Sequence, residues 1–271
     1  MKIKLAAIII LSVFFLSCRD KKESVTIQET ASNFQNKGHE VVAAMVAKVG
    51  DYKKLIEKND VVYTYAYETP DGQKDVSTEK YIFKGELSYG AYSQHERTFP
   101  DLDGLIEQGY DGNNYWLKHK GQILTDTVRL KRVAFNRPTN FYWFAMFQKL
   151  LDPGLNYEFI GEKMLNETAY DVVKISFQSN DDTPTDTYQL YINKQTLLVD
   201  QFLFTVADFG VLETPYLMQL QYEAIDGMLI PTKRQYKKST WNADVSDDPW
   251  IHVTWSDIKF NNGLSKDDFK S

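Results

Sequence analysis

Residues 60–68 read Asp-Val-Val-Tyr-Thr-Tyr-Ala-Tyr-Glu, and apolar side chains recur in this run at every second position. The recurring residues are Val61, Tyr63, Tyr65 and Tyr67. In an extended chain such residues point to one face, so the run predicts a β-strand with one face toward a core. Pro70-Asp71-Gly72 then supplies turn residues, and Tyr81 and Phe83 alternate in a predicted return strand.

Similar alternating runs, separated by turn residues, continue along most of the chain. They cover residues 87–91, 115–117, 173–177, 188–192, 197–206, 218–222 and 250–260. Asp226-Gly227 is a two-residue hairpin signal of the kind that joins antiparallel neighbours. A meander of about ten such strands has to curl. We therefore expect a mainly β (α+β) protein built on one strongly curved antiparallel sheet.

Two regions carry helical patterns instead. Residues 38–58 have apolar side chains at helical spacing, with a break at Gly50-Asp51. Residues 128–136 suit a basic helix, and we expect Pro138 to end it because proline lacks the backbone N–H that a helix interior needs.

The segment after Asn140 is the most unusual internal feature, and Asn140 can cap a helix over residues 141–151. Phe141–Phe147 reads Phe-Tyr-Trp-Phe-Ala-Met-Phe, which is apolar on every side of a helix, so this helix has to be buried or covered. Two interpretations stay open: a core helix in the concave side of the sheet, or a lid over an apolar ligand pocket. Burial of each ligand methylene contributes about 0.8 kcal/mol, so a lipid chain could bind here without any catalytic residue.

The N-terminal segment has the composition of a secretory signal. Met1–Lys4 is cationic, residues 5–15 form an apolar run that is too short to span a membrane, and Leu16-Ser17-Cys18 resembles a bacterial lipobox. In lipobox proteins the cysteine is acylated and becomes the first residue. The resemblance implies a signal peptide over 1–17, a lipidated cysteine with a flexible polar tether over 18–37, and a single β-rich domain over 38–271.

Composition excludes several classes of function. The formal net charge is −6, and it moves from −6 to −8 when Lys2 and Lys4 leave with the signal, whereas nucleic-acid binding needs clustered cations. Cys18 is the single cysteine, so its acylation leaves no thiol for a disulfide, a metal or catalysis. No phosphate loop, nucleophile elbow or dinucleotide fingerprint is present, and we expect no cofactor, no metal and no catalytic residue. The histidines do not pair at metal-binding spacing, and we expect them on the surface: His39, His95, His119 and His252.

Several motifs together resemble the periplasmic lipoprotein carriers and receptors of the LolA/LolB type. Tyr110-Asp-Gly-Asn-Asn-Tyr-Trp-Leu is similar to a strand motif of that fold, and residues 170–177 with 188–200 are similar to its hairpin. The chain also resembles a set of outer-membrane lipoproteins from Bacteroidota-type bacteria over most of its length after residue 40. This resemblance implies no known activity. The segments that carry this second similarity are 140–144, 152–157 and 226–232.

The resemblance implies a half-open β-barrel with helices in its concave side. It also implies a lipid anchor in the outer membrane, on the periplasmic side by default, with the cell-surface side left open.

We expect a membrane-anchored, non-catalytic lipoprotein that binds a hydrophobic ligand or an acylated partner in the half-barrel. Its partners are then the membrane, through acylated Cys18, and a lipid or lipoprotein ligand; the oligomeric state is left open. The residues expected at the ligand are Tyr63, Tyr65, Tyr67, Phe83, Tyr142, Trp143, Met146 and Phe147. One alternative is a sensor or scaffold whose concave face binds a protein segment, and a remote alternative is a hydrolase that uses scattered Asp and Glu.

Cys18→Ser tests the anchor. Because an acyl chain cannot attach to serine in this way, we expect the variant to be released from membranes or to stall before processing. Membrane fractionation with a carbonate wash measures this, with the unaltered chain as control. Carbonate-resistant attachment of the variant, equal to that of the unaltered chain, would show that Cys18 does not anchor the protein.

Overall fold

The computed structural model describes residues 33–179 and 183–271. The predicted signal peptide, Cys18 and most of the predicted tether lie outside the described residues. Residues 34–271 form one compact unit.

The described residues form thirteen strands in one antiparallel sheet, three more than the roughly ten that the sequence pattern predicts. The strands are β1 (Asp60–Glu68), β2 (Lys74–Ile82), β3 (Leu87–His95), β4 (Ile106–Tyr110), β5 (Tyr115–His119), β6 (Gln122–Leu124), β7 (Leu155–Leu165), β8 (Thr168–Phe177), β9 (Thr187–Asn193), β10 (Val199–Val206), β11 (Val211–Ile225), β12 (Met228–Lys238) and β13 (Ile251–Phe260). Their spatial order is β6-β5-β4-β3-β2-β1-β13-β12-β11-β10-β9-β8-β7. The strands that the sequence pattern does not predict are β4, β6 and β7. β4 and β6 are short and carry too few residues for a clear alternation, whereas β7 is a long strand of 11 residues.

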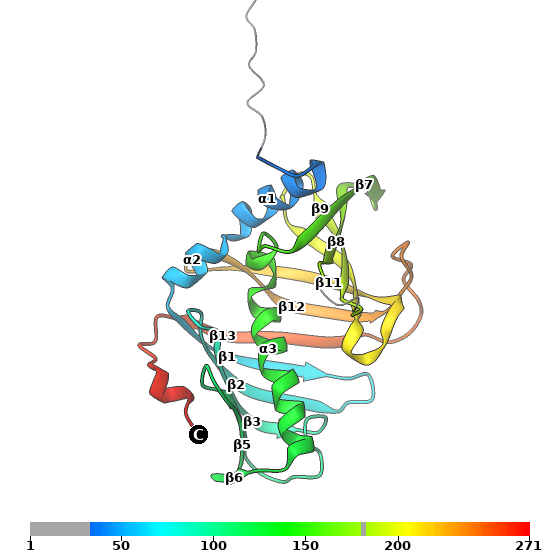
Figure 1. Ribbon diagram of the computed structural model, residues 1–271. Helices are drawn as coiled ribbons and strands as arrows, with labels where there is room; N and C mark the ends of the chain where they lie inside the picture. Colours follow the sequence, from blue (N-terminus) through cyan, green and yellow to red (C-terminus); the bar gives the residue numbers. More distant parts are fainter. Residues whose placement is uncertain (1–32, 180–182) are drawn as a thin grey trace, which may run out of the picture. The chain divides into compact units, whose positions relative to one another are not determined.

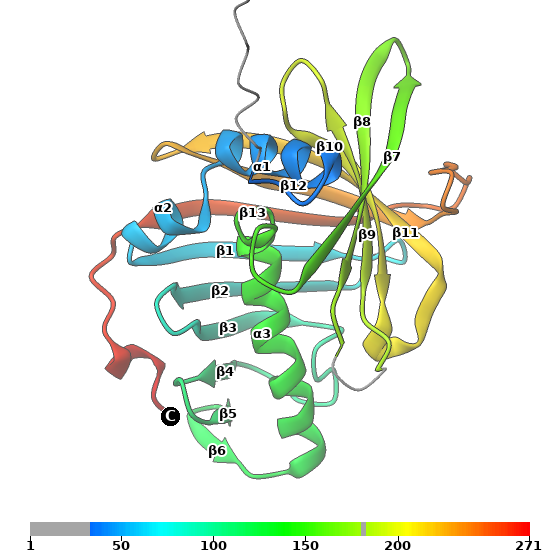
Figure 2. The ribbon, with the colours of Figure 1, turned by 45° about the horizontal axis from the view of Figure 1, so that its top comes forward.

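The sheet is strongly curved and stays open. β6 and β7 stand at the two ends of the strand order and do not pair with each other. Figure 2 shows the strands from β7 to β11 rising out of the layer that β1 to β5 form, so that the sheet wraps around a concave side. This confirms the predicted fold class.

Five helical segments complete the described fold. They are α1 (Lys37–Val49), α2 (Tyr52–Glu57), α3 (Thr127–Lys149) and two short 3-10 turns, η1 (Ala207–Phe209) and η2 (Lys266–Phe269). α3 runs along the concave side of the sheet, and α1 and α2 lie near its C-terminal end (Figure 1). Within the described residues, no helix combines the length and the apolar character that a membrane crossing requires.

α3 corrects the prediction of two helices divided at Pro138. It is one helix of 23 residues with Pro138 inside it, and its N-cap is Asp126, whose side chain accepts a hydrogen bond from the Arg129 backbone N–H. Asn140, the predicted cap, lies within the helix and donates to the Tyr92 hydroxyl. An interior proline costs about 3 kcal/mol. The packing of both halves of the helix against one sheet offsets that cost.

The first, middle and last parts of α3 pack into three different core clusters. Its first part contributes Val133 to a cluster with β3, β4 and β5. Its middle contributes Phe141, Phe144 and Ala145 to a cluster on β1, β2 and β13. Its last part contributes residues such as Met146 to the largest cluster, on β7 to β11 and α1. One helix therefore holds the two arms of the open sheet together.

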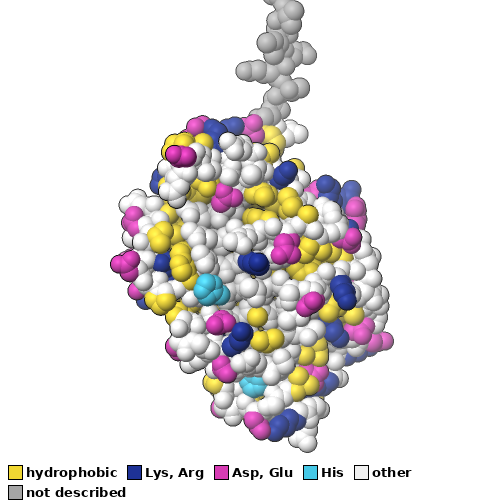
Figure 3. Space-filling model, turned by 180° about the vertical axis from the view of Figure 1, so that it is seen from behind, with side chains coloured by type: hydrophobic (Ala, Val, Ile, Leu, Met, Phe, Trp, Pro, Cys, Tyr) yellow, Lys and Arg dark blue, Asp and Glu magenta, His cyan; other side chains and the backbone are white. Residues whose placement is uncertain are grey.

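The face opposite α3 mixes hydrophobic, acidic and basic side chains (Figure 3). A polar row crosses part of it in register, through Gln201, Gln219, Gln235 and His252. The prediction of surface histidines is wrong for His95, which is only 8% exposed and whose Nε2 lies 2.7 Å from the Gly104 carbonyl oxygen. Its burial follows from its place at the end of β3, under the loop that returns to β4.

Phe144→Ala tests the role of α3. Phe144 is 2% exposed and its ring contacts those of Tyr63, Phe83 and Trp255. We expect truncation to lower the free energy of unfolding by about 3–5 kcal/mol, measured by denaturant titration. Val128→Ala, on the same helix but 74% exposed, should change it by under about 0.5 kcal/mol. Similar losses in both variants would contradict the structure.

Candidate functional site

A cavity of about 480 Å³ lies between α3 and the concave face of the sheet. This volume falls within the usual range for small-molecule sites. Its floor comes mainly from side chains on the central strands: Tyr63, Tyr65, Tyr67, Val253, Trp255, Arg234, Tyr236, Met218, Tyr216, Phe204 and Tyr188. Its roof comes from α3: Arg132, Phe135, Asn136, Thr139, Asn140 and Trp143.

The roof residues recur every three or four positions, so they form a single stripe of the helix. The neighbouring stripe, which includes Val133, Arg137, Phe141 and Phe144, is buried against the sheet. α3 therefore uses one side for packing and another side to cover a space. This geometry combines the two interpretations that the sequence leaves open, a core helix and a cover over a pocket.

The structure brings four of the eight predicted ligand residues to the cavity. These are Tyr63, Tyr65, Tyr67 and Trp143. The other four are packed elsewhere. Phe83 belongs to the core cluster on β1, β2 and β13. The remaining three pack in or against the largest core cluster, on β7 to β11 and α1: Tyr142, Met146 and Phe147. The role of all eight in binding stays a prediction.

The tyrosine hydroxyls of the floor are partly satisfied by one another. The Tyr63 hydroxyl lies 3.0 Å from that of Tyr81, and the Tyr67 hydroxyl lies 2.5 Å from that of Tyr236. Burial raises the pKa of Tyr63 well above its ordinary value, and the nearby Glu79 carboxylate raises it further. Tyr63 is therefore neutral at physiological pH, and the tyrosines of the floor give the cavity an aromatic wall with polar tips.

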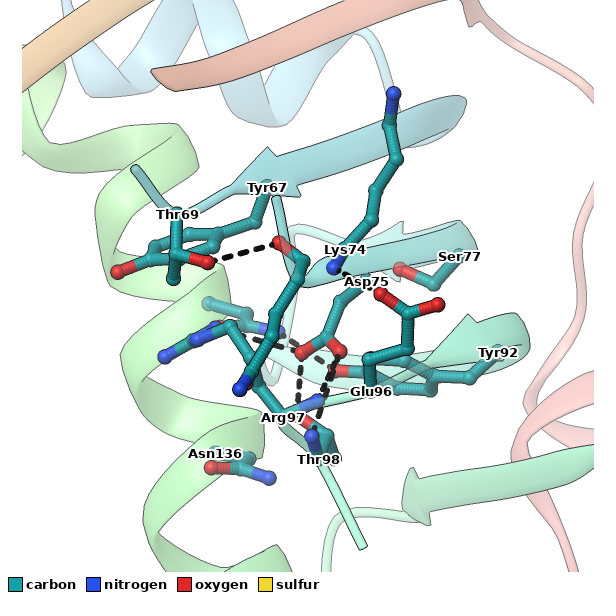
Figure 4. Close-up of polar contacts among 12 residues, drawn as sticks. Tyr67, Thr69, Lys74, Asp75, Ser77, Tyr92, Glu96, Arg97, Thr98 and Asn136 are labelled. Atoms are coloured by element: carbon teal, nitrogen blue, oxygen red, sulfur yellow. Dashed lines mark hydrogen bonds and ion pairs between the residues drawn. The ribbon is translucent and has the colours of Figure 1, made fainter. Parts of the chain in front are cut away.

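A polar cluster closes one rim of the cavity, between β2 and the loop after β3 (Figure 4). The Asp75 carboxylate accepts hydrogen bonds from the Arg97 backbone N–H at 2.9 Å and from the Thr98 hydroxyl at 2.8 Å. The Arg97 guanidinium also pairs with it at 3.4 Å and stacks over the Tyr67 ring, 3.6 Å from the centroid. Asp75 is thus engaged in holding the loop.

A buried ion pair fixes the middle of α3 to the sheet. Arg137 Nη1 donates to Glu79 Oε2 at 2.9 Å, and both side chains are fully buried. Ser77 and Tyr81 donate to the same carboxylate. A side chain at Gly90 would meet this pair, because a Cβ there would lie 2.5 Å from Arg137 Nη1. Burial lowers the pKa of Arg137, but the Glu79 charge and hydrogen bond together with the nearby Tyr92 and Tyr81 side chains raise it overall.

Aromatic and cationic side chains surround the opposite rim. Phe209, on η1, is 58% exposed and packs on Phe135 with ring centroids 5.0 Å apart. The Arg132 guanidinium lies 5.8 Å from the Phe209 ring centroid. The exposure of Phe209 places this rim at the protein surface.

The charged residues of the cavity are not among the ligand residues that the sequence predicts. Arg234, Arg97 and Asp75 all line it. Arg234 carried a signal, because it lies two residues before Tyr236 on an alternating strand and therefore shares the inward face. Among residues 33–179 and 183–271, no group of three or more His, Cys, Asp or Glu side chains is placed to hold a metal ion.

Comparison with known proteins identifies the fold. No family model and no curated protein matches the chain. A DUF1329 family protein from Desulfovibrio piger superposes with a TM-score of 0.51 at 11% identity, over 86% of this chain and 97% of that protein. A putative outer membrane lipoprotein-sorting protein domain from Vibrio parahaemolyticus gives 0.51 at 14% identity, over 86% and 96%. A LolA superfamily protein from Nitrosomonas europaea gives 0.47 at 13% identity, over 82% and 98%.

Likeness at such identities concerns the fold alone. The chain shares its fold with the first two of these proteins. The predicted strongly curved, open antiparallel sheet is confirmed by the strand order.

Arg137→Met tests the buried ion pair. It leaves the Glu79 carboxylate buried without its partner, so we expect a loss of about 3–5 kcal/mol in the free energy of unfolding. Replacing both residues together (Arg137→Met with Glu79→Leu) should recover most of that loss, because no uncompensated charge remains. The control is Lys120→Met, which removes an exposed pair with Asp103 and should cost about 1 kcal/mol or less. Urea titration measures the free energy of unfolding of all three variants. A double variant that is less stable than Arg137→Met alone would contradict this explanation.

Proposed function

We propose that this protein is a non-catalytic carrier or receptor that holds the apolar part of a ligand, a lipid or the acyl chain of a partner protein, in the cavity beneath α3. The main support for this proposal is the cavity of about 480 Å³, which has an aromatic floor. One stripe of α3 covers this cavity, and the neighbouring stripe of the helix is buried in the core. Apolar walls with a few polar groups are typical of such sites.

The state of the polar groups supports binding rather than chemistry. Asp75 is occupied by Arg97 and Thr98. Asp186 accepts from the Ala207 backbone N–H at 2.7 Å, and burial raises its pKa. These carboxylates hold loops at the ends of the cavity. The charge of Asp208, which also lines the cavity, raises the pKa of Asp186 further, and no histidine is among the described residues that line the cavity.

The proposal extends to the site of action. The lipobox-like segment at Cys18 and the similarity to outer-membrane lipoproteins from Bacteroidota-type bacteria support a lipid anchor in the outer membrane, with the domain on the periplasmic side. The Vibrio parahaemolyticus domain that shares the fold is named as a putative lipoprotein-sorting protein, and this supports an acylated ligand.

The proposal is tested on the full chain carrying Cys18→Ser, so that no acyl group of its own competes for the cavity. Native mass spectrometry should find a non-covalently bound lipid. N-phenyl-1-naphthylamine, a neutral dye that fluoresces in apolar surroundings, should bind and be displaced by added lipid.

Two neighbouring residues of β11 provide matched variants. Val211 lines the cavity, whereas Leu212 is exposed on the other face. Val211→Trp should fill part of the space and weaken dye binding by about tenfold or more, and Leu212→Trp should leave it unchanged. If the unaltered cavity binds neither lipid nor dye, the proposal is wrong. A protein segment that copurifies in place of lipid would favour the scaffold alternative.

A further inference from the structure

Arg234 is a buried cation at the cavity that has no anionic partner among the described residues. It is 5% exposed and lies on the inward face of β12, in register with Val253 and Leu220 on the two neighbouring strands. Its guanidinium lies 3.8 Å from the centroid of the Trp255 ring, which forms part of the cavity floor.

The hydrogen bonds of Arg234 go to backbone carbonyls alone. Nε donates to the Pro231 carbonyl at 3.2 Å, and Nη2 donates to the Trp143 carbonyl on α3 at 2.9 Å. Within the part of the chain that the structure describes, Nη1 makes no hydrogen bond and no carboxylate lies within ion-pair distance of the guanidinium. Of the carboxylates that line the same cavity, Asp75 pairs with Arg97 and Asp186 accepts from the Ala207 backbone N–H. Asp208 makes no ion pair with Arg234 in the described structure.

The contrast with Arg137 shows how unusual this is. Both arginines are buried on the concave side, but Arg137 has the Glu79 carboxylate at 2.9 Å. The groups that act on Arg234 are the hydroxyls of Tyr222, Tyr63 and Tyr65, which carry no charge at neutral pH, and burial lowers the pKa of Arg234 to about 10. The side chain is still cationic under physiological conditions, and a buried charge without a counter-charge is unfavourable.

Two further donors at the cavity also lack partners. Trp255 Nε1 is buried with no hydrogen-bond partner among the described residues. The Tyr65 hydroxyl, on the strand paired with that of Trp255, makes no hydrogen bond within those residues either. The space beside Arg234 therefore offers hydrogen-bond donors and positive charge, between aromatic walls.

We propose that Arg234 binds the anionic head group, a carboxylate or a phosphate, of an amphiphilic ligand whose apolar chain lies against the aromatic walls toward the rim at Phe209. This inference rests on the proposed function, because it names the class of ligand for the same cavity. A planar guanidinium with a free N–H edge matches a carboxylate or phosphate oxygen, and the ligand supplies the counter-charge that the protein lacks.

The test displaces N-phenyl-1-naphthylamine from the full chain carrying Cys18→Ser. The competitors are dodecanoate, dodecyl phosphate and 1-dodecanol, which share one chain length, and inorganic phosphate, which has no chain. We expect both anionic amphiphiles to displace the dye at about tenfold or more lower concentration than the alcohol. We expect inorganic phosphate to displace none.

Three variants locate the anion. Arg234→Met should abolish the preference for anions over 1-dodecanol, and it should fold, because it removes an unpaired buried charge. Arg234→Lys keeps the charge and should keep part of the preference. Arg132→Met is the matched control at the rim, where it removes a cation that is also without a carboxylate partner in the described structure, and it should keep the full preference.

The outcomes separate the two proposals. If the dye does not bind, the proposed function fails and this inference fails with it. If the dye binds but the alcohol competes as well as the anions, the cavity takes neutral ligands and only this inference is overturned. It is also overturned if Arg132→Met, and not Arg234→Met, removes the preference, or if inorganic phosphate competes as well as dodecyl phosphate. The comparison of competitors in the unaltered cavity decides the matter even if a variant does not fold.

Discussion

The contact of α3 with the concave face of the sheet is the interaction on which the rest of the structure depends. The chain leaves one edge of the sheet at β6 and has to re-enter at the other edge, at β7, and α3 is the connection between them. At 1.5 Å per residue its 23 residues span about 35 Å, enough to cross the whole concave side. An open sheet presents an apolar inner face that needs cover. The helix that joins its edges provides that cover, which explains why α3 tolerates a proline and buries an ion pair.

A helix that has to touch both arms of a curved sheet cannot fill all the space between them. Large aromatic side chains pack at the middle and the C-terminal end of α3, around Phe144 and Phe147. Between residues 132 and 143, the stripe of α3 that faces the aromatic floor does not fill the space between helix and sheet. The cavity thus follows from the same geometry that holds the domain together, and Asp75 and Asp186 hold the loops at its rims.

Sequence patterns predicted the strands well and the site only in part. Alternation identified β1 and its inward tyrosines, because period two follows directly from the backbone of an extended chain. The apolar run at 141–147 was expected to supply much of the pocket, but such a run marks where a helix is packed most tightly. Trp143 alone of that run lines the cavity, and the other roof residues come from the more polar segment 132–140. The prediction that Pro138 ends a helix is wrong, because the local effect of proline does not include the tertiary packing that offsets its free-energy cost inside α3.

The sequence by itself determined the class of architecture, the curvature, the charge balance and the lone cysteine next to a signal-like segment, since each depends on composition or on a local period. The tertiary structure alone decided which inward residues face space and which face core. It also decided which buried charges find partners: Arg137 meets Glu79 across 58 positions, while Arg234 meets none in the described chain. Such pairings depend on the register and curl of distant strands, which no local period encodes.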